Sequence, residues 1–379
     1  MKKSLPYCLI LCFCLAFTAC EDEDDIAIEQ VLLVYLGGDN NLSWEADAKR
    51  IAIMRGWNGD VSTRILIYQD PSINPPTNPP ILQEVVRQNG ENTTQTIATY
   101  DEENSASAEV FARVIADVKQ RYRPTVSYGL LVFSHGTGWL PQSTYTHPRS
   151  SSFRTLVVDH TDEMEIIDMA AAIPDGTFEY IIFEACLMAN IEVAYEFRNK
   201  TNYILASSAE ILSPGFTGIY STSINNLWAG YNGLKSFAED AFNYWNNQIG
   251  PAQSATFSII KTAALQPLAT FIKENADTTK TVDISAIQHF DRHSYHLFFD
   301  FEDYYSRQLD NDIQRAELTH LIDNAVVWKA ATETFMPGND HGLIGFAVDK
   351  HSGMTTYIPQ ATFPFLNAEY KKLSWTNLP

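Results

Sequence analysis

Two short apolar runs constrain the fold of this chain more than any other feature. Residues 128–134 form the first run and residues 180–186 the second, and both consist almost entirely of aliphatic and aromatic side chains. Runs of this length and composition are typical of strands that are buried on both faces of a parallel sheet. The sequence therefore predicts that both segments lie inside a sheet that is covered on its two faces.

Strand patterns and helix patterns alternate around these two runs. Further strands are predicted at residues 31–36, 63–68, 82–87, 156–159, 203–207, 342–348 and 355–358. Helices are predicted at residues 43–57, 105–121, 163–172, 187–199, 234–247, 265–275 and 310–334. Such alternation indicates an α/β fold with a mostly parallel central sheet and helices on both faces. A mainly helical region follows residue 230, and its two late strands are expected to extend the sheet.

The composition is that of a globular protein with a strongly acidic surface. The chain has 379 residues, a hydrophobic fraction of 45% and a formal net charge of −20. This length suggests one large domain with an appendage, or two domains. The charge excludes nucleic acids and anionic membranes as partners and favours cationic ones.

The first twenty residues have the pattern of an export signal. Lys2 and Lys3 precede the apolar residues 7–17, which are too few to span a bilayer. Residues 17–20 (FTAC) resemble a bacterial lipobox, which implies that residues 1–19 are removed and that Cys20 is lipidated. A plain secretory peptide or a signal anchor is the alternative.

An acidic segment follows the predicted lipidation site. Residues 21–25 are all Asp or Glu, which indicates a solvated tether over residues 20–30. The segment also resembles the acidic export tag of surface lipoproteins in the Bacteroides group. The resemblance implies a protein that is lipid-anchored in the outer membrane and exposed at the cell surface.

Cys186 and His135 are the candidate reactive pair. Cys8, Cys12 and Cys14 lie in the predicted signal, so Cys186 is the one thiol left free and no internal disulfide is expected. Each residue of the pair follows a predicted buried strand, and reacting groups lie beyond the carboxyl ends of strands in open parallel sheets. A nearby imidazole can convert a thiol into a nucleophilic thiolate. The alternative is an inert buried cysteine and an ordinary loop histidine.

Four segments carry a family resemblance. They are residues 35–42, residues 134–139 (SHGTGW), residues 185–188 (ACLM) and residues 207–215. In this order they resemble the clostripain family of cysteine peptidases, over most of residues 31–220. The histidine precedes the cysteine by roughly 50 residues, as in caspases.

The resemblance implies a caspase-like α/β/α sandwich and a cysteine endopeptidase that cuts after Arg or Lys. Cys186 would be the nucleophile and His135 the base, with the backbone N–H groups of Gly136 and Cys186 as the oxyanion hole. Activation is expected through self-cleavage in the loop of residues 139–155, where Arg149 and Arg154 are the candidate sites. No cofactor is implied.

Glu184 and Glu210 are the candidate residues for binding a basic substrate side chain. The family usually has Asp two residues before the nucleophile, where this chain has Glu184. Residues two apart in a strand face the same side, so Glu184 is expected to point toward Cys186 and to bind a cation. The alternative is that Glu184 only orients a neighbouring backbone group.

The predicted organisation has four parts: a signal (1–19), a tether (20–30), a peptidase domain (31–248) and a mainly helical subdomain (249–379). His289, His293 and His296 have nearly helical spacing, but no metalloprotease motif or calcium loop accompanies them, so no metal site is predicted. The expected partner is a peptide or protein substrate with a basic residue, bound by a monomer. A retired peptidase fold that serves as a binding or scaffold lipoprotein is the main alternative, and a transpeptidase is another.

Overall fold

The structure is a computed structural model that describes residues 27–37, 40–70, 79–101, 104–141, 156–159, 162–340 and 342–378. The predicted signal, Cys20 and the candidate cleavage sites Arg149 and Arg154 lie outside these residues. Within them, no helix combines the length and the apolar character that a membrane crossing requires.

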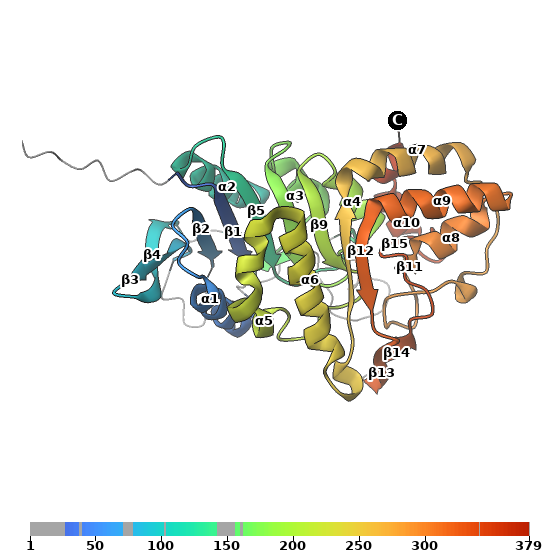
Figure 1. The fold of residues 1–379 in the computed structure, drawn as a ribbon. Coiled ribbons are helices and arrows are strands. Elements are labelled where there is room, and N and C mark those ends of the chain that lie inside the picture. The colour runs from blue at the N-terminus through green and yellow to red at the C-terminus, as the bar shows by residue number, and fades with distance from the viewer. Residues whose placement is uncertain are drawn as a thin grey trace, which may run out of the picture.

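A nine-stranded sheet runs through the molecule in the order β12-β10-β9-β8-β5-β1-β2-β3-β4 (Figure 1). Its strands are β1 (Gln30–Leu36), β2 (Thr63–Gln69), β3 (Ile81–Gln88), β4 (Glu91–Thr99), β5 (Ser127–Phe133), β8 (Phe178–Glu184), β9 (Thr201–Ser207), β10 (Thr256–Lys261) and β12 (Val326–Ala331). The five strands from β9 to β2 are parallel, and two antiparallel strands extend the sheet at each edge. The predicted, mostly parallel central sheet is therefore confirmed.

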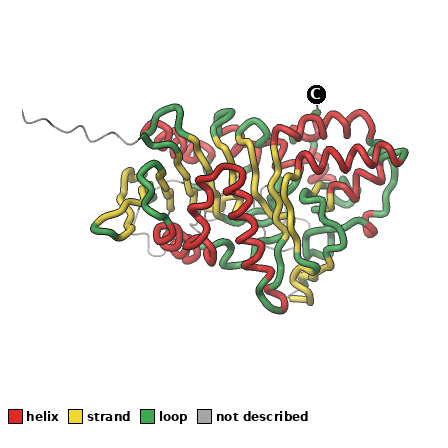
Figure 2. The backbone as a smooth tube through the Cα atoms, in the orientation of Figure 1, coloured by secondary structure: helices red, strands yellow, loops and turns green. Residues whose placement is uncertain are grey.

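Helices cover both faces of this sheet, as Figure 2 shows. They are α1 (Ser43–Gly56), α2 (Ala108–Arg121), α3 (Ile166–Ala172), α4 (Ile191–Glu196), α5 (Thr217–Ser223), α6 (Gly230–Asn246), α7 (Leu265–Asn275), α8 (Phe301–Gln308), α9 (Asp312–Ala325) and α10 (Pro364–Tyr370). Short two-stranded pairs join β6 (Leu156–Asp159) to β7 (Asp162–Met164), β11 (Phe299–Asp300) to β15 (Thr355–Thr356), and β13 (Thr334–Asp340) to β14 (Leu343–Ala347).

Successive side chains of β1 point to opposite faces of the sheet and so divide the core into two layers. Leu33 and Tyr35 pack in one apolar cluster with side chains of α2, α3 and α4, whereas Leu32 and Val34 pack in the other with side chains of α1, α5 and α6. Successive strand residues point to opposite faces, so a strand that is apolar at every position must be covered on both. This explains why the apolar runs predict an α/β/α sandwich.

The C-terminal half differs from the prediction in three places. The helix expected over residues 310–334 ends at Ala325, because the chain continues as β12 and pairs with β10 at the open edge of the sheet. The late strands predicted at 342–348 and 355–358 do not join the main sheet; β14 and β15 form the two-stranded pairs instead. The main sheet is extended instead by β10 and β12, two strands that lie after the predicted domain boundary at residue 248.

Two predicted helices are also shorter than expected. Residues 163–172 contain the end of β7 before α3 begins at Ile166, and α4 covers only Ile191–Glu196 of residues 187–199. The side chain of Asn190 accepts a hydrogen bond from the backbone N–H of Val193, which starts α4 as an N-cap. The residues between Cys186 and this cap are therefore a turn at the end of β8.

The order of the parallel strands reverses at β1. The chain places β2 on one side of β1 and then crosses to place β5 on the other side. In open α/β sheets such a reversal leaves a crevice outside the carboxyl ends of the two strands, where ligands bind. The carboxyl ends of β1, β5 and β8 are therefore the first place to look for a functional site.

Candidate active site

The sheet register brings His135 and Cys186 to the same edge. Phe133 of β5 pairs with Glu184 of β8. His135 lies two residues after Phe133, and Cys186 lies two residues after Glu184. Neighbouring strands lie about 4.8 Å apart, so the two residues occupy equivalent places on adjacent strands. The two positions predicted to form a dyad are therefore neighbours in the fold.

Gly136 lets the two loops approach closely. A Cβ at this position would lie 2.8 Å from the Ala185 Cβ and 3.2 Å from the Cys186 backbone nitrogen. The first distance, like the 2.8 Å to the Cys186 backbone oxygen, is shorter than real Cβ atoms show, and the second is tight, so this close approach favours glycine. The backbones of Gly136 and Cys186, which sequence analysis assigned to an oxyanion hole, thus lie against each other.

The surroundings of Cys186 disfavour the charged form of its thiol. Burial, followed by the negative charge of Glu210, raises the pKa of Cys186 to about 12, although the Ile211 amide and Arg292 act in the opposite direction. The Ile211 N–H points at the sulfur, with an N···S distance of 3.4 Å. A thiol with a raised pKa carries little thiolate at neutral pH, so a base has to take its proton before it can act as a nucleophile.

Asn41 orients the His135 ring. The His135 Nε2 lies 2.7 Å from the Asn41 Oδ1, which can only accept a hydrogen bond. Nε2 therefore carries the ring proton, and Nδ1 is left as the basic nitrogen. Sequence analysis missed this partner, although Asn41 follows the β1 strand and belongs to the same edge of the sheet.

Glu184 lies beneath the site and is not open to a ligand. It is 2% exposed, and its Oε1 accepts hydrogen bonds from the Lys49 Nζ at 2.6 Å and from the Phe216 backbone N–H at 2.5 Å. Its other oxygen accepts a hydrogen bond from the Tyr220 hydroxyl. The expected role in binding a substrate cation is therefore corrected: α1 and the segment before α5 cover this carboxylate. Its bond to the Phe216 amide corresponds to the alternative, an orienting role.

Glu210 lies beside the thiol, but an internal arginine occupies its carboxylate. The Arg292 Nε donates to the Glu210 Oε2 at 2.5 Å, and the two side chains are 9% and 12% exposed. Glu210 immediately precedes Ile211, whose amide contacts the Cys186 sulfur. Glu210, one of the two predicted substrate-binding acids, therefore lies next to a residue that contacts Cys186. It is paired with Arg292, which sequence analysis did not identify.

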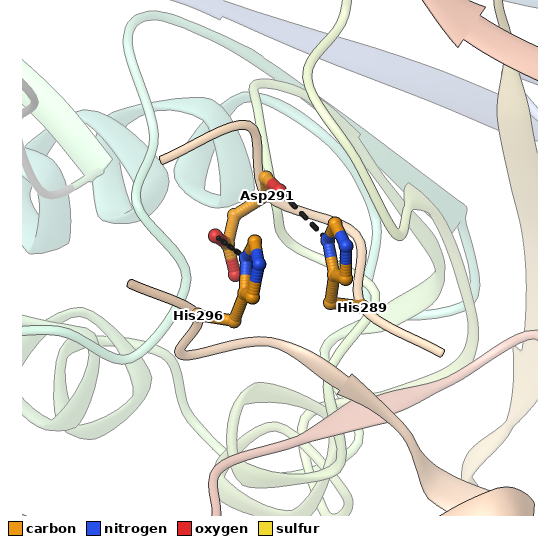
Figure 3. A group of neighbouring side chains, drawn as sticks. All are labelled: His289, Asp291 and His296. Carbon is orange, nitrogen blue, oxygen red and sulfur yellow. Dashed lines mark hydrogen bonds and ion pairs between the residues drawn. The ribbon is translucent and has the colours of Figure 1, made fainter. Parts of the chain in front are cut away.

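Arg292 belongs to a segment that Asp291 holds in place (Figure 3). The Asp291 Oδ2 accepts the backbone N–H groups of Leu297 and Phe298, at 2.9 and 3.0 Å. Its Oδ1 lies 2.9 Å from the His296 Nδ1, and its backbone oxygen lies 3.0 Å from the His289 Nδ1. These contacts fix the loop that presents Arg292.

His289, Asp291 and His296 have the residue types of a metal site, and their ligand atoms lie within 4.8 Å of one another. The two imidazole rings are stacked with centroids 3.5 Å apart and an interplanar angle of 14° (Figure 3). Nearly parallel rings direct their nitrogen lone pairs side by side and not toward a common point. These three residues hold the loop together through hydrogen bonds and ring stacking.

Comparisons with known proteins agree with the family resemblance found in the sequence. A model of the clostripain family matches residues 34–339. The structure of an inactive zymogen C11 protease from Parabacteroides distasonis is 31% identical, with a TM-score of 0.79 over 92% of this chain and 97% of that chain. A secreted C11 cysteine protease from Bacteroides thetaiotaomicron, solved with an irreversible peptide inhibitor, is 26% identical, with a TM-score of 0.79 over 92% of this chain and 98% of that chain. No curated protein sequence gives a significant match.

Proposed function

Because this chain belongs to the clostripain family of cysteine peptidases, we propose that it cleaves peptide bonds after Arg or Lys, with Cys186 as nucleophile and His135 as general base. The observation that carries the proposal is the register of β5 and β8, which places both residues at equivalent positions on one sheet edge. The Asn41 bond adds to it, since it leaves Nδ1 of the same histidine basic.

The proposed reaction follows the chemistry of a thiol and an imidazole. The His135 Nδ1 takes the proton of Cys186, and the thiolate attacks the substrate carbonyl carbon. The backbone N–H groups of Gly136 and Cys186 stabilise the resulting oxyanion. The imidazolium then protonates the leaving amine, which releases it and leaves a thioester. Water, deprotonated by the same imidazole, hydrolyses the thioester and restores the thiol.

Self-cleavage in the 139–155 loop is the proposed activation step, with Arg149 and Arg154 as the candidate sites. The raised pKa of the Cys186 thiol supports it, because that pKa has to fall before the nucleophile can act. The similar structure from Parabacteroides distasonis is described as an inactive zymogen. This loop lies between β5 and the strands before β8, so a cut in it would create two new chain ends between the two proposed catalytic residues in the sequence.

The charges around the thiol support a basic substrate residue. Glu210 and Glu45 raise the pKa of Cys186, and Arg292 lowers it. The nearby Lys49–Glu184 pair is internally neutral. Three carboxylates (Glu45, Glu184 and Glu210) and two cations (Lys49 and Arg292) therefore surround the thiol. This negative balance favours a cationic P1 side chain, and Glu210 is the carboxylate whose charge acts most strongly on the thiol.

We also propose that the mature protein is lipid-anchored through Cys20 in the outer membrane and faces outward. The lipobox-like residues 17–20 and the acidic residues 21–25 support this location. A metabolic palmitate label that is present in the wild type and absent from Cys20→Ala would agree with the proposal, whereas equal labelling of both would contradict it.

A binding or scaffold function without catalysis is the second candidate. It is favoured by the ion pairs at the site, since both candidate pocket acids are paired with internal cations, and by the raised pKa of the Cys186 thiol. A protein that had lost catalysis could keep these interactions permanently. The two candidates differ in whether any treatment produces turnover.

The deciding experiment uses the mature chain and its Cys186→Ala variant with fluorogenic Arg, Lys and Asp peptides. We expect the wild type to cut after Arg or Lys and to become nicked within residues 139–155, as mass spectrometry would show, while the variant stays intact and inactive. If both proteins stay intact, and a wild type nicked by added trypsin is also inactive on every peptide, the binding function is favoured.

A further inference from the structure

We propose that Arg292 is an internal occupant of the substrate pocket, which holds Glu210 until a basic P1 side chain takes its place. The inference rests on the proposed specificity for basic residues and adds to it a residue that controls access to the binding carboxylate. It follows from three features of the described residues: the position of Glu210, the chemistry of its pair with Arg292, and the anchoring of the loop that carries Arg292.

The Glu210 carboxylate is placed to bind the residue next to the scissile bond. Its neighbour Ile211 contacts the Cys186 sulfur through the backbone amide, and the charge of Glu210 acts on the thiol more strongly than any other charge does. A P1 side chain lies beside the nucleophile when its carbonyl is attacked. A carboxylate at this position is therefore within the region where a P1 cation would be neutralised.

Arg292 already makes the interaction that a substrate arginine would need. Its Nε donates to the Glu210 Oε2 at 2.5 Å, a charge-assisted hydrogen bond between guanidinium and carboxylate. With side-chain exposures of 9% and 12%, the pair is nearly closed to solvent. A second guanidinium cannot bind both oxygens of Glu210 while Arg292 keeps one of them, so the two cations compete.

The loop that carries Arg292 is a separate, fixed element. Its bond to Glu210 joins positions 82 residues apart in the sequence. The backbone oxygen of Arg292 accepts the Ile344 N–H at 2.8 Å. Asp291 fixes the adjoining turn through its bonds to the Leu297 and Phe298 amides and through the two histidine contacts shown in Figure 3. The backbone is therefore held, and exchange requires only that the arginine side chain swing out to solvent.

This exchange predicts an effect on substrate binding. Displacement replaces one arginine–carboxylate pair by another, so Arg292→Ala should act mainly on substrate binding and lower KM for Arg substrates. If Arg292 only positioned Glu210, its removal would have the opposite effect and would weaken binding. The sign of the change therefore separates the two roles.

The test measures the rate at which Cys186 of the full mature chain is labelled by an arginyl chloromethyl ketone and by neutral iodoacetamide. We expect Arg292→Ala to accelerate the arginyl reagent about tenfold, whereas iodoacetamide labelling should not accelerate, because Arg292 lowers the pKa of Cys186. Arg292→Lys keeps a cation without the forked donors and should give an intermediate rate. The matched control is Arg315→Ala, which removes an exposed arginine pair with Asp312 on α9 and should change neither rate.

Three results would overturn the inference. An unchanged or slower arginyl reaction in a folded Arg292→Ala variant would show that Arg292 does not compete with substrate. Equal acceleration of both reagents would make the residue a general cover of the thiol. If iodoacetamide labels every variant but arginyl and lysyl reagents label none, the basic specificity itself fails, which is a different pattern from the first two. A urea unfolding curve for each variant confirms that the measured chain is folded.

Discussion

Replacing Lys49 by methionine should lower the free energy of unfolding far more than replacing an exposed charged residue does. Lys49 and Glu184 form an ion pair of 2.6 Å whose side chains are 0% and 1% exposed. The Lys49 Nζ also donates to the Pro214 oxygen at 2.9 Å and to the Thr217 hydroxyl at 3.0 Å. Methionine fills a similar volume but leaves Glu184 buried without its cation.

The size of the effect follows from the burial of the pair. Removing one partner of a buried ion pair destabilises a protein by about 3–5 kcal/mol, because the remaining charge is uncompensated. Typical domains have a total stability of about 5–15 kcal/mol, so this loss is a large share. The segment of residues 214–217 should loosen as well, since it bonds to both members of the pair.

Urea unfolding at pH 7, followed by tryptophan fluorescence, measures the effect in Lys49→Met, Glu184→Leu and the double variant. The double variant should lose less than the sum of the single losses, because it removes both charges of the Lys49–Glu184 pair. Lys372→Met is the matched control: its pair with Glu369 has exposures of 62% and 23%, and its loss should stay below about 1 kcal/mol. A Lys49→Met protein within about 1 kcal/mol of the wild type would refute the reasoning.

Three further predictions concern the reactive residues and one buried acid. In the activated enzyme, Asn41→Ala should lower kcat about ten- to hundredfold with little change in KM, because the His135 tautomer is no longer fixed; a kcat within twofold of the wild type would contradict this. Since burial raises the pKa of Cys186 to about 12, iodoacetamide labelling of the intact chain should rise about tenfold per pH unit from pH 6 to 9, and a plateau in that range would argue against it. Burial also raises the pKa of Glu192 from 4.5 to about 7, so the native state keeps a proton that the unfolded chain releases. The stability of the wild type relative to Glu192→Gln should therefore fall by about 3 kcal/mol as the pH rises from 4.5 through 7, and a pH-independent difference would be evidence against the raised pKa.

The centre of the fold could be predicted because its signal is local. The strands β1, β5 and β8 are apolar at almost every position, so burial on both faces follows from sequence alone. The parallel pairing then places the residues after β5 and β8 at one edge, which is how His135 and Cys186 come together.

The edges of the sheet could not be predicted in the same way. Residues 326–331 continue the pattern of α9 in the sequence and become β12 only because β10 offers unpaired backbone groups. Strand propensity depends on such neighbours more than helix propensity does. Only the tertiary structure supplies this information.

The partners of the site are distant in sequence for the same reason. Lys49 lies 135 residues before Glu184, and Glu210 lies 82 residues before Arg292. A glutamate beside a strand end predicts a charge near the nucleophile, but whether that charge is free or neutralised depends on which element packs over it. Sequence analysis therefore placed Glu184 near the site but wrongly predicted that its carboxylate is free to bind a substrate, whereas Lys49 and the Phe216 amide occupy it.

The most direct test of the central claim is covalent mapping of the nucleophile. The mature wild type, Cys186→Ala and His135→Ala are incubated with a peptidyl-arginine acyloxymethyl ketone and analysed by peptide mass spectrometry. The account predicts one adduct on Cys186 in the wild type, none in Cys186→Ala and a much slower reaction in His135→Ala. An adduct on another residue, or no adduct on Cys186 in a wild type nicked within residues 139–155, would contradict it.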